Sequence, residues 1–405
     1  MDCSWLQKPW TISTPVRGPS NLPKLTTTVG TYGPVQALRF RVTKNFQQKL
    51  NAKLYLPFSG EFSAGQGLDN GCRNSKFLVK ADSGQPLESG HASSSSPRSS
   101  WESVGHGIDV FYRFSRAYVL IGRFIGVLSM SLLAMEKLSD FSPLYLKGLL
   151  KASVAAALMH LYVVGLNQLT DIEIDKVNKP YLPLASGEYS YKTGSLIVAF
   201  SAIVSFCIGW TEGSWPLFWA LFGDFLIGTV YSVDLPLLRW KRSGFLAAVC
   251  IVLLWGVFLP VPCYLHFQTH LLQKPAIFSM PLIFTTVFVS FFSVIIALVK
   301  DIPDIEGDKM FGIQSYTSRL GQERVFWICV TLLEMAYGAA ICVGAMSPNL
   351  WSKWAMVVGH SIMAMALWNR AKQTDVKNKD ATQAFYMFIW KLLYAEYLLV
   401  PFLRY

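Results

Sequence analysis

Two stretches of the chain carry carboxylates at spacings that suit metal chemistry. The first, 167–175, ends a long apolar segment that begins near Leu146. Within it Asn167, Asp171 and Asp175 recur at i, i+4 and i+8. A helix with about 3.6 residues per turn places such residues on one stripe. The sequence therefore predicts a helical stripe of one amide and two carboxylates at the end of an apolar helix.

The second stretch, 300–308, ends another apolar segment in the second half of the chain. Its Asp301, Asp304 and Asp308 follow i, i+3 and i+7, which again predicts one helical stripe. Acidic side chains at a helix C-terminus oppose the helix dipole, so solvated helix ends explain the repeated pattern poorly. Mg²⁺ usually takes one or two carboxylates together with substrate phosphates. The two stretches therefore predict Mg²⁺ sites built from Asp171 and Asp175 and from Asp301, Asp304 and Asp308.

A bound Mg²⁺ and basic side chains would together draw negative charge from the leaving group of an allylic diphosphate. Candidates for diphosphate binding lie beside the acidic stretches or in one further basic segment. They are Asn167, Lys176, Lys179, Arg239, Lys241, Arg242 and Lys300. Lys and Arg that flank membrane spans for topology are the alternative explanation for these basic residues. Tyr231, at the end of an apolar segment, is the candidate residue near the reacting centre.

The composition is that of a membrane protein. Of the 405 residues 52% are hydrophobic and only 15% are charged. The apolar residues after Val110 form runs of about 17–25 residues, the length that spans a bilayer. We expect nine spans, near 117–135, 148–168, 194–210, 215–232, 244–264, 278–299, 325–346, 350–368 and 384–402. The sequence predicts an all-α polytopic bundle.

Loop charge predicts which face of the membrane carries the acidic stretches. Lys and Arg concentrate in the loops after the second, fourth, sixth and eighth spans. These loops therefore face the compartment of synthesis or import, and both acidic stretches open on that same face. Asp224, Glu334 and Glu396 fall inside predicted spans, where we expect each to have a structural partner.

The first part of the chain has the composition of a targeting segment. Between Asp2 and Glu61 there is no acidic residue, while Lys, Arg, Ser and Thr are frequent. An organellar transit peptide has this composition and lacks the apolar core of a secretory signal. The serine-rich stretch 91–100 continues as a polar linker. We therefore expect a plastid transit peptide and disordered linker over 1–108 and a membrane domain over 109–405, with a disordered cytosolic tail as the alternative for the first part.

Other site classes fit the sequence less well. The seven cysteines are scattered and show no CxxC spacing, and the six histidines are dispersed, so we expect no zinc site. The net charge of +11 could indicate nucleic-acid binding, but many of the basic residues flank apolar runs, so we expect no nucleic-acid partner. A transporter would place carboxylates deep in the bilayer, whereas these lie at helix ends beside Lys and Arg.

The motifs resemble the UbiA superfamily of intramembrane prenyltransferases, in particular its plant plastid branch of homogentisate and flavonoid prenyltransferases. The resemblance rests on 167–188, 231–242, 300–308 and 390–397. It implies nine helices around a central cavity, Mg²⁺ dependence and transfer of a prenyl group to an aromatic carbon. One departure is Arg116-Ala117-Tyr118, where the branch commonly has Arg-Pro-His. Because this departure suggests an altered acceptor site, we expect dimethylallyl transfer to a flavonoid or related phenolic, with homogentisate phytyl transfer as the alternative.

Overall fold

The structure is a computed structural model that describes residues 100–403. This part of the chain is helical, with one isolated bridge between Ser243 and Gln314. Its long helices are α3 (Ala117–Ala134), α4 (Pro143–Thr170), α7 (Tyr191–Glu212), α8 (Trp215–Ser232), α11 (Met280–Val299), α14 (Gln322–Ala345), α15 (Leu350–Lys372) and α16 (Lys379–Leu399). One more helical segment runs from Gly244 to Leu271 and contains α9 (Gly244–Val252) and α10 (Pro260–Leu265).

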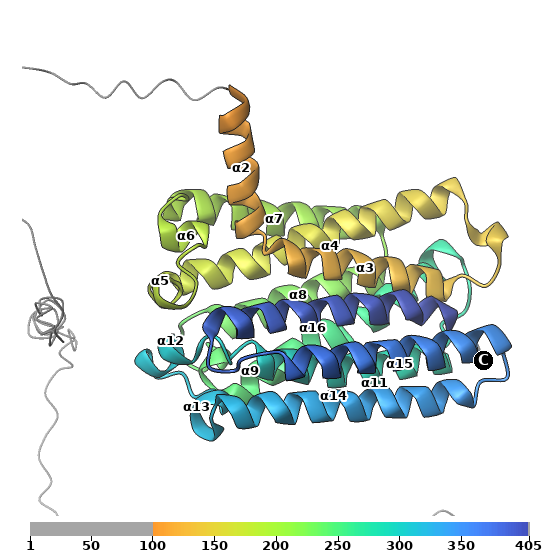
Figure 1. Cartoon of the computed structure of the whole chain (residues 1–405). Helices are drawn as coiled ribbons and strands as arrows, with labels where there is room; N and C mark the ends of the chain where they lie inside the picture. The colour runs from red at the N-terminus through yellow and green to blue at the C-terminus, as the bar shows by residue number, and fades with distance from the viewer. Residues whose placement is uncertain (1–99, 404–405) are drawn as a thin grey trace, which may run out of the picture. The chain divides into compact units, whose positions relative to one another are not determined.

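Short helices complete the described chain. They are α2 (Ser100–Phe114), α5 (Ile172–Asn178), α6 (Pro183–Ser186), α12 (Ile305–Met310) and α13 (Tyr316–Leu320). Figure 1 shows α5, α6, α12 and α13 at one end of the bundle, which we call the polar end. Both acidic stretches and the basic segment 239–242 belong to connections at this end.

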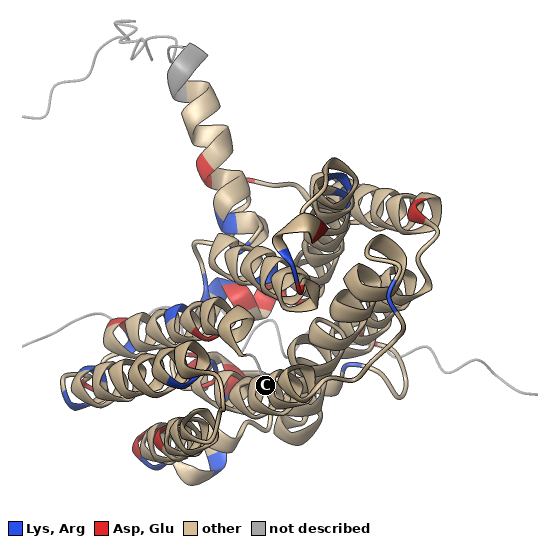
Figure 2. Cartoon of the chain, turned by 90° about the vertical axis from the view of Figure 1, so that its right-hand side faces the viewer, with Lys and Arg blue, Asp and Glu red and all other residues tan. Residues whose placement is uncertain are grey.

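The long helices pack side by side in a closed ring. Helix α4 contacts α3, α7 and α8, α11 contacts α9 and α14, and α14 contacts α15. Helix α16 packs against α3, so the end of the described chain closes the ring beside its beginning. Viewed along the bundle, the helices surround a centre toward which a group of acidic and basic residues gathers (Figure 2). The expected all-α polytopic bundle is confirmed, because the described chain folds into long apolar helices that pack against one another.

The nine expected spans correspond to nine long helical segments within residues 100–403. Seven of these are long and apolar enough to cross a membrane by length and composition. The other two are α8, which contains Asp224, and α15, which carries Lys353 and Arg370. Nine membrane crossings therefore stay a prediction, although both helices pack within the bundle.

Local sequence explains where the helices begin and bend. Ser142 begins α4 by accepting a hydrogen bond from the Tyr145 amide at 3.2 Å, as expected of a helix cap. In the 244–271 segment, Pro260 and Pro262 have no amide hydrogen to donate, and π-helical turns occupy Leu253–Val257 and His266–Leu271. Where the π-helical turn Leu253–Val257 approaches α11, a Cβ on Gly256 would lie 2.6 Å from the Ser290 Cα, so no larger residue fits there.

Two buried ion pairs lie inside the bundle. Arg123 on α3 donates to Asp224 on α8 at 2.5 Å, and the guanidinium lies 5.1 Å from the Trp255 ring centre. His360 on α15 lies 3.3 Å from Glu396 on α16. Asp224 and Glu396 thus have the structural partners expected of them. Glu334 is half-buried, and no partner is shown for its Oε1 within the described chain.

We predict that Arg123→Met strongly destabilises the protein, because it leaves the Asp224 carboxylate buried without its cation. Breaking such a pair typically costs about 3–5 kcal/mol. The double variant Arg123→Met with Asp224→Leu removes both charges and should recover most of the lost stability. Thermal unfolding of the detergent-solubilised proteins measures this. Equal melting temperatures for the wild type and the single variant would contradict the prediction.

Candidate active site

A pocket at the polar end collects most of the residues that the sequence singled out. Its space is about 760 Å³ including the open mouth. Of the candidates it is lined by Asn167, Asp171, Asp175, Lys179, Tyr231, Lys241, Lys300, Asp301, Asp304 and Asp308. Six separate segments of the chain contribute to its lining, so the pocket exists only when the ring is closed.

The first acidic stretch is not one continuous helix, contrary to the predicted stripe. Helix α4 ends at Thr170, and Asp171 has non-helical dihedrals (φ −119°, ψ 13°) before α5 starts. The amide of Asn167 donates to the Asp171 carboxylate at 2.9 Å, so this polar pair holds the junction. The break moves Asp175 onto a separate short helix, yet both carboxylates still face the pocket.

The second stretch is interrupted in the same way, so its predicted single stripe is also wrong. Helix α11 ends at Val299, turns follow, and α12 begins only at Ile305. Pro303 explains the interruption, because it cannot donate a helical hydrogen bond and disfavours helix in the residue before it. Asp301 lies in the turn, Asp304 precedes α12, and Asp308 lies on it.

Backbone contacts join these interrupted segments. Asn178, at the end of α5, accepts a hydrogen bond from the Gly307 amide of α12 at 3.1 Å. A Cβ at Gly307 would lie 2.3 Å from that Asn178 oxygen, so only glycine permits this approach. The Ser243–Gln314 bridge likewise joins the basic segment 239–242 to the chain that follows α12. The two acidic stretches and the basic segment are therefore held as one unit.

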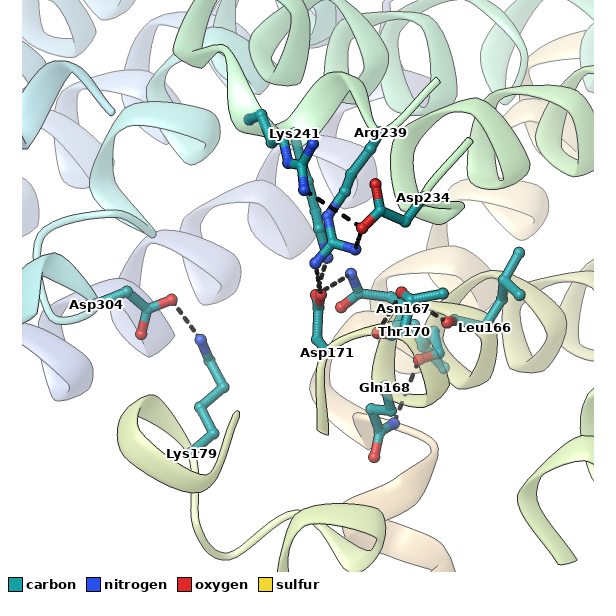
Figure 3. Close-up of polar contacts among 12 residues, drawn as sticks. Leu166, Asn167, Gln168, Thr170, Asp171, Lys179, Asp234, Arg239, Lys241 and Asp304 are labelled. Carbon is teal, nitrogen blue, oxygen red and sulfur yellow. Dashed lines mark hydrogen bonds and ion pairs between the residues drawn. The ribbon is translucent and has the colours of Figure 1, made fainter. Parts of the chain in front are cut away.

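Acidic and basic side chains alternate across the pocket (Figure 3). Lys241 forms an ion pair with Asp171, which Arg239 also contacts at 3.3 Å. Across the gap from this group, Lys179 pairs with Asp304. Lys300 donates to Asp301 at 2.7 Å. Each of these pairs is largely buried, where an unpaired charge would be costly.

Burial also shifts two of the carboxyl groups toward their neutral forms. Burial raises the pKa of Asp175 to about 6, against the opposing effect of Arg116 and Lys179. Burial, together with the negative charge of Asp301, raises the pKa of Asp308 to about 7. These two acids therefore lack enough cationic compensation from the protein side chains alone.

The donor set fits Mg²⁺. The lining supplies five carboxylates and three amides, the hard oxygen ligands that Mg²⁺ prefers. The buried Asp175 Oδ2 has no hydrogen-bond partner within the described chain. No group of three His, Cys, Asp or Glu side chains in residues 100–403 is close enough to hold a metal alone. Mg²⁺ that is bound by one or two carboxylates takes its remaining ligands from water or from substrate phosphates.

Three of the predicted diphosphate ligands do not line this pocket. Lys176 is exposed and pairs with Glu173 at 2.7 Å, because it lies on the outer face of α5. Arg242 is exposed and contacts Asp234 at 3.3 Å. Arg239 contacts Asp171, but it lines a second, neighbouring pocket and not this one.

The pocket also contains residues that the sequence reasoning did not assign to the site. They are Arg116, Tyr118, Ile174, Asn178, Gly244, Ile313, Ser315, Gln383 and Tyr386. Arg116 donates to Asn167 at 3.1 Å and has a left-handed backbone (φ 45°), which turns the chain into α3. The sequence offered a signal for Arg116, because an arginine stands at the start of the first predicted span. Tyr118 belongs to the departure from Arg-Pro-His, which was also a signal, whereas Tyr386 had none, because its ring meets that of Tyr118 only when α16 packs against α3.

Comparison with known proteins identifies the family. The UbiA prenyltransferase family model matches residues 124–392. The chain belongs to the UbiA prenyltransferase family. It is 58% identical over 330 residues to homogentisate phytyltransferase 1, chloroplastic, from Arabidopsis thaliana, covering 82% of each chain. It is 49% identical over 329 residues to naringenin 8-dimethylallyltransferase 2, chloroplastic, from Sophora flavescens, covering 81% of each.

A solved structure supports the fold independently. A UbiA homolog from Archaeoglobus fulgidus, bound to GPP and Mg²⁺, superimposes with a TM-score of 0.50 at 16% identity. The match covers 72% of this chain and 99% of the archaeal one. At this level of identity the match establishes the UbiA-type bundle, which the sequence resemblance had predicted. The chain is thus a prenyltransferase of the membrane.

We predict that Asp171→Ala or Asp304→Ala each lowers turnover about 100-fold or more, a loss typical when charge stabilisation at a reacting centre is removed. The matched control is Glu173→Ala, which removes an exposed carboxylate two positions from Asp171. Prenyl transfer by membrane fractions containing equal amounts of each variant measures the effect. Metal chelation should abolish activity of the wild type. Full activity in EDTA, or in either Asp variant, would contradict the metal assignment.

A second prediction separates the basic residues. Lys241→Ala should lower kcat/KM for the diphosphate donor about tenfold or more, since a charged hydrogen bond contributes roughly 1.5–3 kcal/mol. Arg242→Ala, one residue away but exposed, should leave it unchanged. The KM of the aromatic acceptor should barely move in either variant. A change confined to the acceptor KM would show that Lys241 binds the acceptor instead.

Proposed function

We propose that this aromatic prenyltransferase transfers a phytyl group from phytyl diphosphate to homogentisate, and that it does so in a plastid membrane. The observation that carries the reaction type is the buried pocket in which five carboxylates alternate with lysines. The proposed acceptor and donor are supported by the 58% identity to the Arabidopsis phytyltransferase, against 49% to the Sophora dimethylallyltransferase. Both relatives carry "chloroplastic" in their names, which supports the location.

The lysine–carboxylate pairs of the pocket suit a metal diphosphate, because the metal ion would bind the carboxylates and the diphosphate would bind the lysines. Asp171, Asp175, Asp301, Asp304 and Asp308 would hold Mg²⁺. Lys179, Lys241 and Lys300, released from their carboxylates, would bind the diphosphate oxygens. When bound, Mg²⁺ supplies Lewis-acid withdrawal of charge from the leaving group. In this exchange each of the three lysines and its carboxylate would have a partner of opposite charge both before and after the substrate binds.

The aromatic side chains of the pocket would stabilise the allylic cation and keep water away from it. In the proposed reaction the C–O bond of the allylic diphosphate breaks and diphosphate leaves, a C–C bond forms to an aromatic carbon, and the ring loses a proton to restore its aromaticity. Water near the allylic cation would compete with the acceptor. Tyr118, Tyr231 and Tyr386 line the pocket, and Trp390 packs on both Tyr118 and Tyr386 with ring centres 5.8 and 6.3 Å away. Aromatic faces attract cations while excluding water.

A second candidate is dimethylallyl transfer to a flavonoid or related phenolic. The observation that favours it is the Arg116-Ala117-Tyr118 departure from Arg-Pro-His. Arg116 and Tyr118 both line the pocket, so the departure changes the surface that an acceptor would meet. The phenol of Tyr118 is larger than an imidazole and alters both the volume and the hydrogen bonding at that position.

The two candidates are separated by one assay. Membranes containing the protein are offered dimethylallyl, geranyl and phytyl diphosphates in turn, each with homogentisate or naringenin. We expect the highest kcat/KM with phytyl diphosphate and homogentisate. Preference for dimethylallyl diphosphate and naringenin would reject this proposal in favour of the second candidate. No transfer with any pair, in a protein that is correctly inserted, would reject both.

A paired variant tests the acceptor site directly. In Ala117→Pro with Tyr118→His, which restores the motif common in the branch, we expect the donor KM to stay constant, because the phosphate-binding lysines are untouched. If Tyr118 contacts the acceptor, the ratio of kcat/KM for homogentisate over naringenin should change. An unchanged ratio would place the acceptor elsewhere in the pocket.

A further inference from the structure

Helix α2 extends away from the ring of long helices. Figure 1 shows it leaving the bundle near the polar end, and the view along the bundle in Figure 2 shows the same projection. It has 15 residues, and within its described side chains only Val110 and Phe114 are buried. Most of α2 therefore has no protein partner in the described chain.

The exposed side chains of α2 separate into two faces. Val104, Ile108 and Phe111 are spaced i, i+4 and i+7, which places them on one apolar stripe, with exposed fractions of 53%, 66% and 42%. His106, Asp109 and Arg113 follow i, i+3 and i+7 on the other side. This division is that of an amphipathic helix, and its apolar stripe faces no other described element.

Polar contacts fix the end of α2 that joins the bundle. Arg113 binds Asp109 at 2.9 Å within the helix and Glu188 with two hydrogen bonds of 2.6 and 2.7 Å. It also donates to the Tyr181 carbonyl at 2.7 Å. The polar face of α2 thus attaches to the segment around α6, and this attachment fixes the direction in which the helix leaves the bundle.

The position of α2 along the bundle coincides with the ends of membrane spans. It is followed by a turn at Ser115–Arg116 and then directly by α3, which is apolar and long enough to cross the membrane. The segment around α6, to which Arg113 binds, directly precedes α7, a second helix of that kind. Helix α2 therefore leaves the bundle at the level where membrane spans begin. At this level the hydrocarbon core of a bilayer meets the headgroups.

We propose that α2 is a membrane-interface helix that binds the bilayer surface at the polar end of the protein. Val104, Ile108 and Phe111 enter the outer part of the acyl layer, while His106 and Asp109 remain among headgroups and water. An isolated helix of this length is marginal in water, and its apolar stripe would be exposed there. The bilayer interface favours such a helix and covers the stripe, and the exposed apolar residues of α3 and α7 are continuous with that lipid surface.

This placement has a consequence for the pocket. Arg113 binds Tyr181 and Glu188, which belong to the segment that follows Lys179. Before that segment, α5 places Asp175 and Asn178 in the pocket. Lipid contact by α2 would therefore hold one wall of the pocket at a fixed level relative to the membrane. Arg113 and Glu188 are positioning residues in this arrangement, since neither lines the pocket.

Site-directed spin labelling tests the placement in the full chain reconstituted into phospholipid vesicles. Single cysteines are introduced at Ile108 or Phe111, with the native cysteines replaced and prenyl transfer checked. Asp109 is the matched control, being adjacent to Ile108 but on the polar face. We expect labels at 108 and 111 to be accessible to oxygen and protected from a water-soluble nickel chelate, with the opposite result at 109.

Each other outcome rejects the proposal. High nickel accessibility at all three positions would place α2 in water. Protection from both reagents at 108 and 111 would mean that protein covers the stripe. A short label-to-label distance between molecules would then identify a second copy, and its absence would identify the first 99 residues. None of these results bears on the acceptor, so this test is separate from that of the proposed reaction.

Discussion

Charge compensation in a place of low polarity governs the structure of this enzyme. Five carboxylates gather where the bundle ends, and in the described structure three of them are paired with lysines. Neither sign of charge would be stable there alone, because burial favours neutral forms. The raised pKa values of Asp175 and Asp308 indicate a remaining deficit of positive charge that a divalent cation would supply. Stability without substrate and the proposed affinity for a metal diphosphate would thus arise from the same set of side chains.

The irregular backbone at the polar end follows from this requirement. A continuous helix would place Asn167, Asp171 and Asp175 in one line along its length. The break at Asp171 instead changes the direction of the chain, so that α5 lies at the mouth of the ring. Pro303 produces the equivalent break after α11. Only glycine at 307 lets the two broken ends approach closely enough to share a hydrogen bond. The long helices supply a rigid apolar wall, and the short ones aim the polar groups.

Much of this arrangement was predictable, and what was not has a physical reason. Apolar run length revealed the bundle, and acid spacing identified the residues that gather at its end, since both are local properties. The helix breaks were harder, because the same spacing suits either a continuous helix or a kinked one. Lys176 and Arg242 lie outside the pocket, because loop charge reports the membrane face and not the direction of a side chain. Tyr386 could not be found, because its place depends on α16 closing against α3 after nearly the whole chain has been made.

The Arg123–Asp224 pair makes the stability of one span in the membrane depend on another span. The two residues are 101 positions apart, so the span that carries the arginine is synthesised well before the one that carries the aspartate. A lone arginine at the middle of a span disfavours its insertion by about 2.5–3.5 kcal/mol. Helix α3 is otherwise strongly apolar, with glycines and serines on the side that meets its neighbours. It therefore gains its final stability in the bilayer only when α8 arrives with the carboxylate, and the ring assembles around a contact that its first helix cannot satisfy alone.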